Sequence, residues 1–191
     1  MSLRVLVIPE DPTYNGYLLK PLAERMLAGC GRARAKVTIL TNPRAAGYEH
    51  AKRLIRDDLI PTYRSVDLML FLPDRDGQDR AAELHALEEH AAQNGVTLLC
   101  CAAVEEVEVW ALAGHTEKLA ERWQDVRANI NVKEQVFLPF LAKYGSQREP
   151  GEGRKRLMHE AMQNYRGVLA RCDELARLEQ RIREHLNATT P

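Results

Sequence analysis

Residues 66–76 read VDLMLFLPDRD, an apolar stretch that ends in two acidic side chains. Three other stretches have the same apolar character and are also rich in Val, Leu and Ile: LRVLVIP at 3–9, KVTILT at 36–41 and VTLLCCAA at 96–103. Short runs of this kind are typical of strands that are buried on both faces of a sheet. The sequence therefore predicts four strands, at 3–9, 36–41, 66–73 and 96–103.

The segments between these strands show helical spacing of their apolar residues. Helices are expected at 16–28, 48–59 and 78–93, as in Leu18, Leu22 and Met26 of the first. Strands that alternate with helices are joined by crossover connections and form a parallel sheet. We therefore expect an α/β fold with a four-stranded, mostly parallel sheet flanked by helices.

From residue 106 onward the pattern predicts helices alone, at 107–113, 116–126, 132–142, 154–169 and 173–186. The predicted organisation is an α/β domain at 1–114 and a helical extension at 115–191. The extension is expected to pack on the sheet domain and to end in a helical hairpin at 154–187.

The composition is that of an ordinary globular protein, with 27 Lys and Arg against 27 Asp and Glu and 45% hydrophobic residues. No apolar run approaches the ~20 residues that span a bilayer, and no secretory signal precedes the first strand. We expect a cytoplasmic protein without a membrane partner. The four cysteines include no CxxC pair and are expected to be reduced, which disfavours a zinc or redox motif.

Acidic side chains follow three of the predicted strands. Glu10 and Asp11 follow the first strand, Asp74 and Asp76 the third, and Glu105, Glu106 and Glu108 the fourth. The carboxyl ends of parallel strands meet at one edge of the sheet, where ligands bind. Seven carboxylates would repel one another there unless a cation lay among them. Ligation by oxygen alone favours Mg²⁺ or Mn²⁺.

Most of these acidic residues also have a structural interpretation that involves no ligand, and Glu10 has the weakest one. Asp76 and Asp79 lie before Ala81, near which the helix proper is expected to begin, and could cap it. Glu105, Glu106 and Glu108 suit the first turn of a helix. Glu10 has no helix start beside it. The coincidence of three groups favours a metal site.

A modest basic excess lies in the last part of the chain, where residues 143–191 carry 10 Lys and Arg against 7 Asp and Glu. Arg154, Lys155 and Arg156 begin a predicted helix, where cations oppose the helix dipole unless they bind an anion. These three residues are the predicted nucleic-acid contacts, and simple solvation is the alternative.

The glutamate that ends the first strand, Glu10, and the Asp-x-Asp that ends the third, Asp74 and Asp76, resemble the Toprim fold of topoisomerases, primases and overcoming-lysogenization-defect nucleases. Residues 103–114, AVEEVEVWALAG, are similar to the acid-x-acid-x-Trp segment of small bacterial Toprim-like proteins, and residues 150–182 are similar to their helical tail. The resemblance implies a Mg²⁺ or Mn²⁺ site at Glu10, Asp74, Asp76, Glu106 and Glu108. It implies catalysis by Glu10, as general base or metal-positioning acid, together with Asp74 and Asp76. This sequence departs from the Toprim pattern because no glycine follows Glu10.

These observations favour a metal-dependent endonuclease that hydrolyses phosphodiester bonds of DNA or RNA. The resemblance also implies an ABC-type ATPase as a partner and a role in defence against phage. A non-catalytic Toprim-like subunit of an ATPase complex is the alternative, and a small-molecule phosphatase is a third candidate. Self-association into a homo-oligomer stays open.

Overall fold

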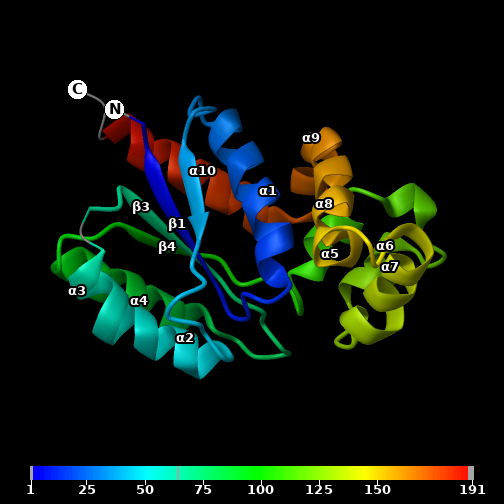
Figure 1. Cartoon of the computed structure of the whole chain (residues 1–191), viewed down its shortest axis with the longest axis horizontal. Helices are drawn as coiled ribbons and strands as arrows, with labels where there is room; N and C mark the ends of the chain where they lie inside the picture. The colour runs from blue at the N-terminus through cyan, green and yellow to red at the C-terminus, as the bar shows by residue number, and fades with distance from the viewer. Residues whose placement is uncertain (1, 64, 189–191) are drawn as a thin grey trace.

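Four short parallel strands form the centre of the protein in the computed structural model, which describes residues 2–63 and 65–188. The strands are β1 (Arg4–Pro9), β2 (Lys36–Ile39), β3 (Leu68–Leu72) and β4 (Leu98–Cys100). Their order across the sheet is β2-β1-β3-β4, and each neighbouring pair is parallel (Figure 1). The predicted fold class is confirmed.

The central position of β1 and β3 in the sheet explains why β3 is apolar throughout and β1 is apolar after Arg4. Val5 lies opposite Leu68, and Phe71 lies opposite Cys100 in the next pair. All five residues of β3 are buried, because helices cover both faces of the sheet. Helices on both faces are the usual setting of a parallel sheet.

One face of the sheet is covered by α1 (Asn15–Gly29) and α10 (Asp173–Ala188). The apolar side chains of α10 (Leu175, Leu178, Ile182 and Leu186) join those of β1 and α1 in one buried cluster. The last helix of the chain therefore completes the layer that the first helix begins (Figure 1). Residues 189–191, which belong to the predicted extension, lie outside the described residues.

The opposite face is covered by a helical segment that follows β2 and by α4 (Ala81–Gln93). That segment consists of α2 (Tyr48–Leu54), a π-helical turn η1 (Ile55–Leu59) and α3 (Ile60–Thr62). A second buried cluster, separate from the first, holds these helices on the sheet.

The remaining elements lie beyond the carboxyl ends of the strands and are short. They are α5 (Glu108–Leu112), the 3₁₀ turn η2 (Thr116–Lys118), α6 (Trp123–Arg127), the π-helical turn η3 (Lys133–Phe137), α7 (Leu138–Tyr144), the 3₁₀ turn η4 (Pro150–Gly153), α8 (Arg154–Gln163) and α9 (Tyr165–Arg171). Among them, α8 packs against α1 and α5.

Two predicted helices are interrupted. The segment 116–126 contains only η2 and the start of α6, because the backbone is extended at Leu119 and Arg122. The expected helix at 154–169 breaks at Asn164, which has φ −99° and ψ 39°. The side chain of Asn164 lies against Gly167, where an added Cβ would lie 2.4 Å from its Oδ1.

The helices of the described residues include none that is both long enough and apolar enough to span a bilayer.

Candidate metal centre

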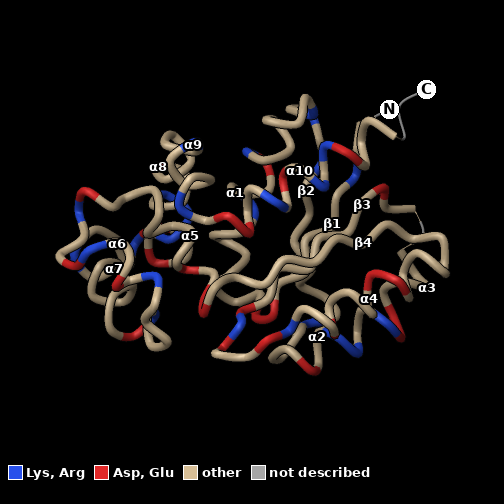
Figure 2. Tube along the Cα trace, turned by 180° about the vertical axis from the view of Figure 1, so that it is seen from behind, with Lys and Arg blue, Asp and Glu red and all other residues tan. Residues whose placement is uncertain are grey.

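The pairing between β3 and β4 continues past the ends of the two strands. Asp74 forms an isolated parallel bridge with Ala103, and the backbone N–H of Ala103 donates to the carbonyl of Pro73 at 2.9 Å. This extension holds the segment after β3 beside the segment that leads into α5. Acidic segments follow the ends of the strands in this region (Figure 2).

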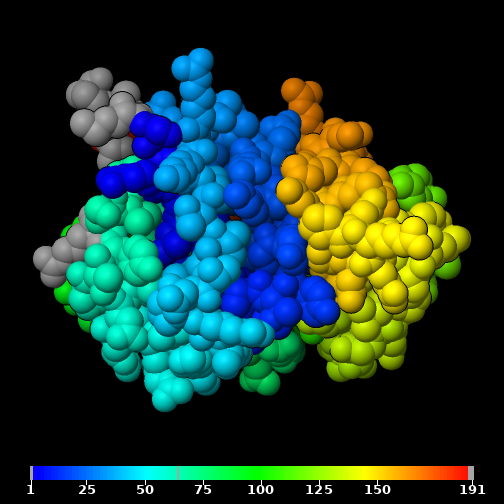
Figure 3. All heavy atoms as spheres, viewed as in Figure 1, coloured from blue at the N-terminus to red at the C-terminus, as the bar shows by residue number. Residues whose placement is uncertain are grey.

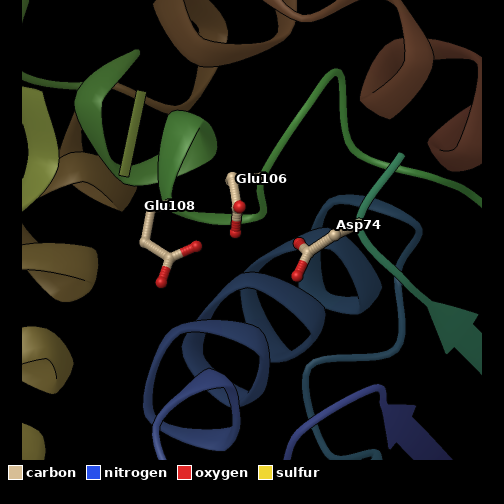
Figure 4. Close-up of side chains that lie close together, drawn as sticks. All are labelled: Asp74, Glu106 and Glu108. Carbon is tan, nitrogen blue, oxygen red and sulfur yellow. The ribbon is translucent and has the colours of Figure 1, made fainter. Parts of the chain in front are cut away.

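Three carboxylates meet there. Asp74, Glu106 and Glu108 each offer one oxygen, and these oxygens all lie within 4.8 Å of one another. The three side chains point toward a common space from the end of β3, from the loop after β4 and from the start of α5 (Figure 4). Residues 2–63 and 65–188 hold no other group of this kind. This group is called the acidic triad below.

Glu108 is the most deeply buried member of the acidic triad. Its side chain has no exposed surface, and neither carboxylate oxygen accepts a hydrogen bond from any described residue. Burial of a charged carboxylate without hydrogen-bond donors is costly, and such groups are normally paired or bound to a metal. Glu108 therefore has capacity to accept a ligand.

Among the described residues, Lys133 is the one cation that forms ion pairs with the carboxylates of the acidic triad. The Nζ atom of Lys133, at the start of η3, lies 3.1 Å from Oε2 of Glu106 and 3.4 Å from Oε1 of Glu108. The carboxylates raise the pKa of Lys133 even though burial lowers it, so the ammonium stays charged. One positive charge thus faces three carboxylates.

The local environment opposes ionisation of two triad members. Burial raises the pKa of Asp74 well above its usual range, and the charges of Glu108 and Glu106 raise it further. Burial also raises the pKa of Glu106, although Lys133 opposes the shift. Asp74 is held in place because its Oδ1 accepts a hydrogen bond of 2.7 Å from the backbone N–H of Val107. A divalent cation would stabilise the ionised forms.

Glu10 lies directly beside the acidic triad. Its Oε2 accepts a hydrogen bond of 3.2 Å from the backbone N–H of Asp74. Burial raises the pKa of Glu10, and the charge of Asp76 adds to the shift. The structure thus brings Glu10 and Asp74 together, as the positions of the strand ends predict, while Glu10 contributes no oxygen to the triad itself.

Asp76 is not one of the three residues of the acidic triad. It is exposed, has a left-handed backbone with φ 52° and forms an ion pair of 3.3 Å with Arg80. Arg80 also donates through Nε to the carbonyl of Asp74 at 3.1 Å, and its guanidinium lies 3.6 Å from the ring centroid of Tyr48. Asp76 therefore lies at the rim of the site and outside the triad.

Glu105 has a structural role. It is buried, and it accepts hydrogen bonds from the backbone N–H of Gly77 at 2.7 Å and from the guanidinium of Arg75. Its backbone carbonyl accepts from the N–H of Arg75 at 2.9 Å. Glu105 therefore stabilises the turn that follows Asp74. Its left-handed backbone, with φ 68°, changes the direction of the chain so that Glu106 and Glu108 reach the site.

The predicted basic contacts have three different environments. Arg154 is buried, donates to the carbonyl of Gly151 at 3.1 Å and lies 4.1 Å from the ring centroid of Tyr14. Arg156 forms ion pairs with Glu149 and Glu160. Lys155 is exposed and lines a groove beside α1. Of the three, only Lys155 presents an unpaired charge to solvent among the described residues.

Comparison with models of protein families, with curated proteins and with solved structures finds no match for this chain. The parallel four-stranded sheet with its flanking helices is therefore what the structure establishes about the fold.

Sequence reasoning did not identify Lys133 as part of the site. It is separated from Glu108 by 24 intervening residues and two short helical elements, and no local motif marks it. The arrangement that results, three clustered carboxylates with one ammonium and a neighbouring Glu10, can bind a divalent cation by oxygen ligation.

Proposed function

We propose that the chain holds Mg²⁺ or Mn²⁺ at the acidic triad and acts as a metal-dependent nuclease on DNA or RNA. The observation that carries the proposal is Glu108, a fully buried carboxylate whose oxygens accept no hydrogen bond within the described residues and face Asp74 and Glu106. A divalent cation would supply the positive charge that Lys133 provides only in part.

Each residue has a distinct role in this proposal. Asp74, Glu106 and Glu108 hold the cation, which when bound supplies Lewis-acid stabilisation of phosphoryl oxygens. Glu10 accepts the proton of the attacking water, because its raised pKa brings it closer to neutral pH, where a general base is effective. Asp76 and its partner Arg80 set the charge at the rim.

The choice of phosphodiester chemistry rests on analogy. Glu10 after β1 and Asp74 and Asp76 after β3 resemble the Toprim pattern, and their position at the carboxyl ends of parallel strands supports this comparison. The same analogy suggests an ABC-type ATPase partner and a role in defence against phage.

One observation favours the alternative, a non-catalytic subunit of an ATPase complex. Lys133 already provides a cation to Glu106 and Glu108, and such a pair can exist for stability alone. On this alternative the carboxylates orient α5 and η3 against each other, and no phosphodiester bond is cleaved.

Cleavage assays separate the two functions. Single-stranded DNA, duplex DNA and structured RNA are incubated with the parent protein and Mg²⁺ or Mn²⁺, with and without any ATPase encoded beside the gene. We expect cleavage by the parent and by the Asp79→Asn control, whose exposed side chain accepts a hydrogen bond from the N–H of Ala81 at the start of α4. Glu10→Gln and Asp74→Asn should be inactive. If the parent cleaves no substrate, the non-catalytic alternative replaces the proposal.

A further inference from the structure

A groove runs along α1 on the face shown in Figure 3. It encloses about 790 Å³ and is bounded by β2 on one side and by the start of α8 on the other. Ligand sites in proteins typically have volumes of roughly 300–1,000 Å³. The residues that matter for its chemistry are Tyr17, Lys20, Glu24, Lys36, Lys155 and His159.

These residues come from three elements that α1 brings together. Tyr17, Lys20 and Glu24 follow one another at helical spacing, so they share one face of α1 and form the floor of the groove. Lys36 lies on β2, the edge strand of the sheet. Lys155 and His159 are one turn apart on α8.

The groove carries an excess of unpaired positive charge. Lys20, Lys36 and Lys155 are exposed, and none of them forms an ion pair with any residue that the structure describes. The neighbouring Arg154 and Arg156 are, in contrast, paired with glutamates. Glu24 is the one acidic residue among those lining the groove in the described chain. Three free ammonium groups around one groove favour a ligand with several negative charges.

Tyr17 adds an aromatic surface to this groove. Its side chain is 38% exposed, and a Cβ on Gly151 would lie only 2.5 Å from its Cδ2 atom. The ring is therefore packed closely against the backbone of η4, which the glycine permits. An aromatic ring held by its surroundings and partly open to solvent is a platform on which a nucleobase can stack.

We infer that this groove binds a single strand of nucleic acid, with phosphates at Lys20, Lys36 and Lys155 and a base on Tyr17. The combination of separate cations and one aromatic platform is the usual chemistry of single-strand binding. The inference rests on the proposed function for its link to cleavage. Pro12 and Thr13 line the groove and follow Glu10 closely in the chain, so the groove includes residues next to the proposed general base.

Binding is measured separately from cleavage. The fluorescence anisotropy of labelled oligothymidine and oligouridine is followed in EDTA, with the full chain, over a series of salt concentrations. The test variant is Lys20→Gln, Lys36→Gln and Lys155→Gln combined. The control combines Arg53→Gln, Lys143→Gln and Arg166→Gln, which removes three exposed cations outside the groove. Melting temperatures establish that both variants are folded.

The test variant should bind at least tenfold more weakly at low salt than the parent. Its salt dependence should be less steep by about two units of slope, since each single-strand phosphate contact contributes about 0.7. Tyr17→Ala should weaken binding by roughly tenfold, and the control variant should bind like the parent.

Two outcomes would overturn the inference. One is equal loss of binding in the test and control variants, which would mean non-specific attraction. The other is that the parent does not bind the oligonucleotides, which would leave an acidic peptide along the edge of β2 as the ligand of the groove. Failure of the proposed function is a different result: Glu10→Gln and parent would then both bind the oligonucleotide through the groove, and neither would cleave it.

Discussion

The ammonium of Lys133 lies 3.4 Å from Oε1 of Glu108, a carboxylate with no exposed surface. Within the described part of the chain, Lys133 is the only residue that forms ion pairs with the carboxylates of the acidic triad. A divalent ion and the ammonium would therefore compete for the same oxygens. That competition contributes to the stability of the protein and affects its affinity for metal.

Removal of the ammonium should destabilise the protein and increase its response to metal. Lys133→Met leaves Glu106 and Glu108 without their partner, and since Lys133 is partly exposed we expect a loss of about 1–3 kcal/mol in the free energy of unfolding. The rise in melting temperature on addition of Mn²⁺ should become larger. Urea denaturation and thermal melts measure both effects. Lys143→Met, at an exposed lysine of α7, is the control and should change neither. An equal metal response in the parent and Lys133→Met would mean that metal binds elsewhere.

The metal-free protein should gain stability on mild acidification. Asp74 and Glu106 have raised pKa values in the folded protein, so the folded state binds more protons than the unfolded state above their ordinary pKa values. Their contribution to stability is present below those ordinary values and is lost as the pH rises through the folded-state pKa values. Between pH ~5 and ~7, the melting temperature should fall less with rising pH in Asp74→Asn combined with Glu106→Gln than in the parent. An identical pH dependence of the two proteins would contradict the raised pKa values of these carboxylates.

Glu105 should matter for stability and not for metal binding. Glu105→Gln loses its ion pair with Arg75 and weakens the clamp on Gly77, which should cost about 1–3 kcal/mol in the free energy of unfolding. The melting-temperature shift caused by Mn²⁺ should remain. Loss of that shift in the folded variant would place Glu105 among the metal ligands.

Arg154 and Lys155 are adjacent in α8, but their substitution should affect the stability of the protein differently. Arg154→Gln removes a buried guanidinium that bonds Gly151 and Glu152, so a loss of about 1–3 kcal/mol in the free energy of unfolding is expected. Lys155→Gln should change stability by less than about 0.5 kcal/mol, because its side chain is exposed. Urea denaturation distinguishes them. Equal losses would show that Lys155 is part of the packing.

The fold class could be predicted because the strands carry a strong local signal. Leu68–Leu72 is buried on both faces and is therefore apolar at every position. The apolar residues of the helices between the strands recur at helical spacing. The interruption at Asn164 depends on a contact between its side chain and Gly167, and the spacing of apolar residues does not report such a contact.

The candidate site could be predicted in part for a similar reason. Asp74 and Glu10 come together because both lie just past the carboxyl ends of neighbouring parallel strands. The sequence could not predict which of the acidic residues after β4 belong to the acidic triad. A left-handed backbone at Glu105 sends that side chain toward Gly77, while Glu106 and Glu108 face Asp74. The position of Lys133 beside the triad depends on the packing of η3 beside α5, and no local sequence motif marks it.

The central claim is that the acidic triad binds a divalent cation, and titration of Mn²⁺ followed by electron paramagnetic resonance tests it most directly. The parent and the Asp79→Asn control should bind one tightly held ion per chain with the same affinity. Asp74→Asn and Glu108→Gln, shown by thermal melts to be folded, should each weaken that binding by at least tenfold, because each removes a charged ligand from a set of three. Unchanged Mn²⁺ affinity in folded Glu108→Gln would contradict the account, and Glu108 would then be a buried partner of Lys133 alone.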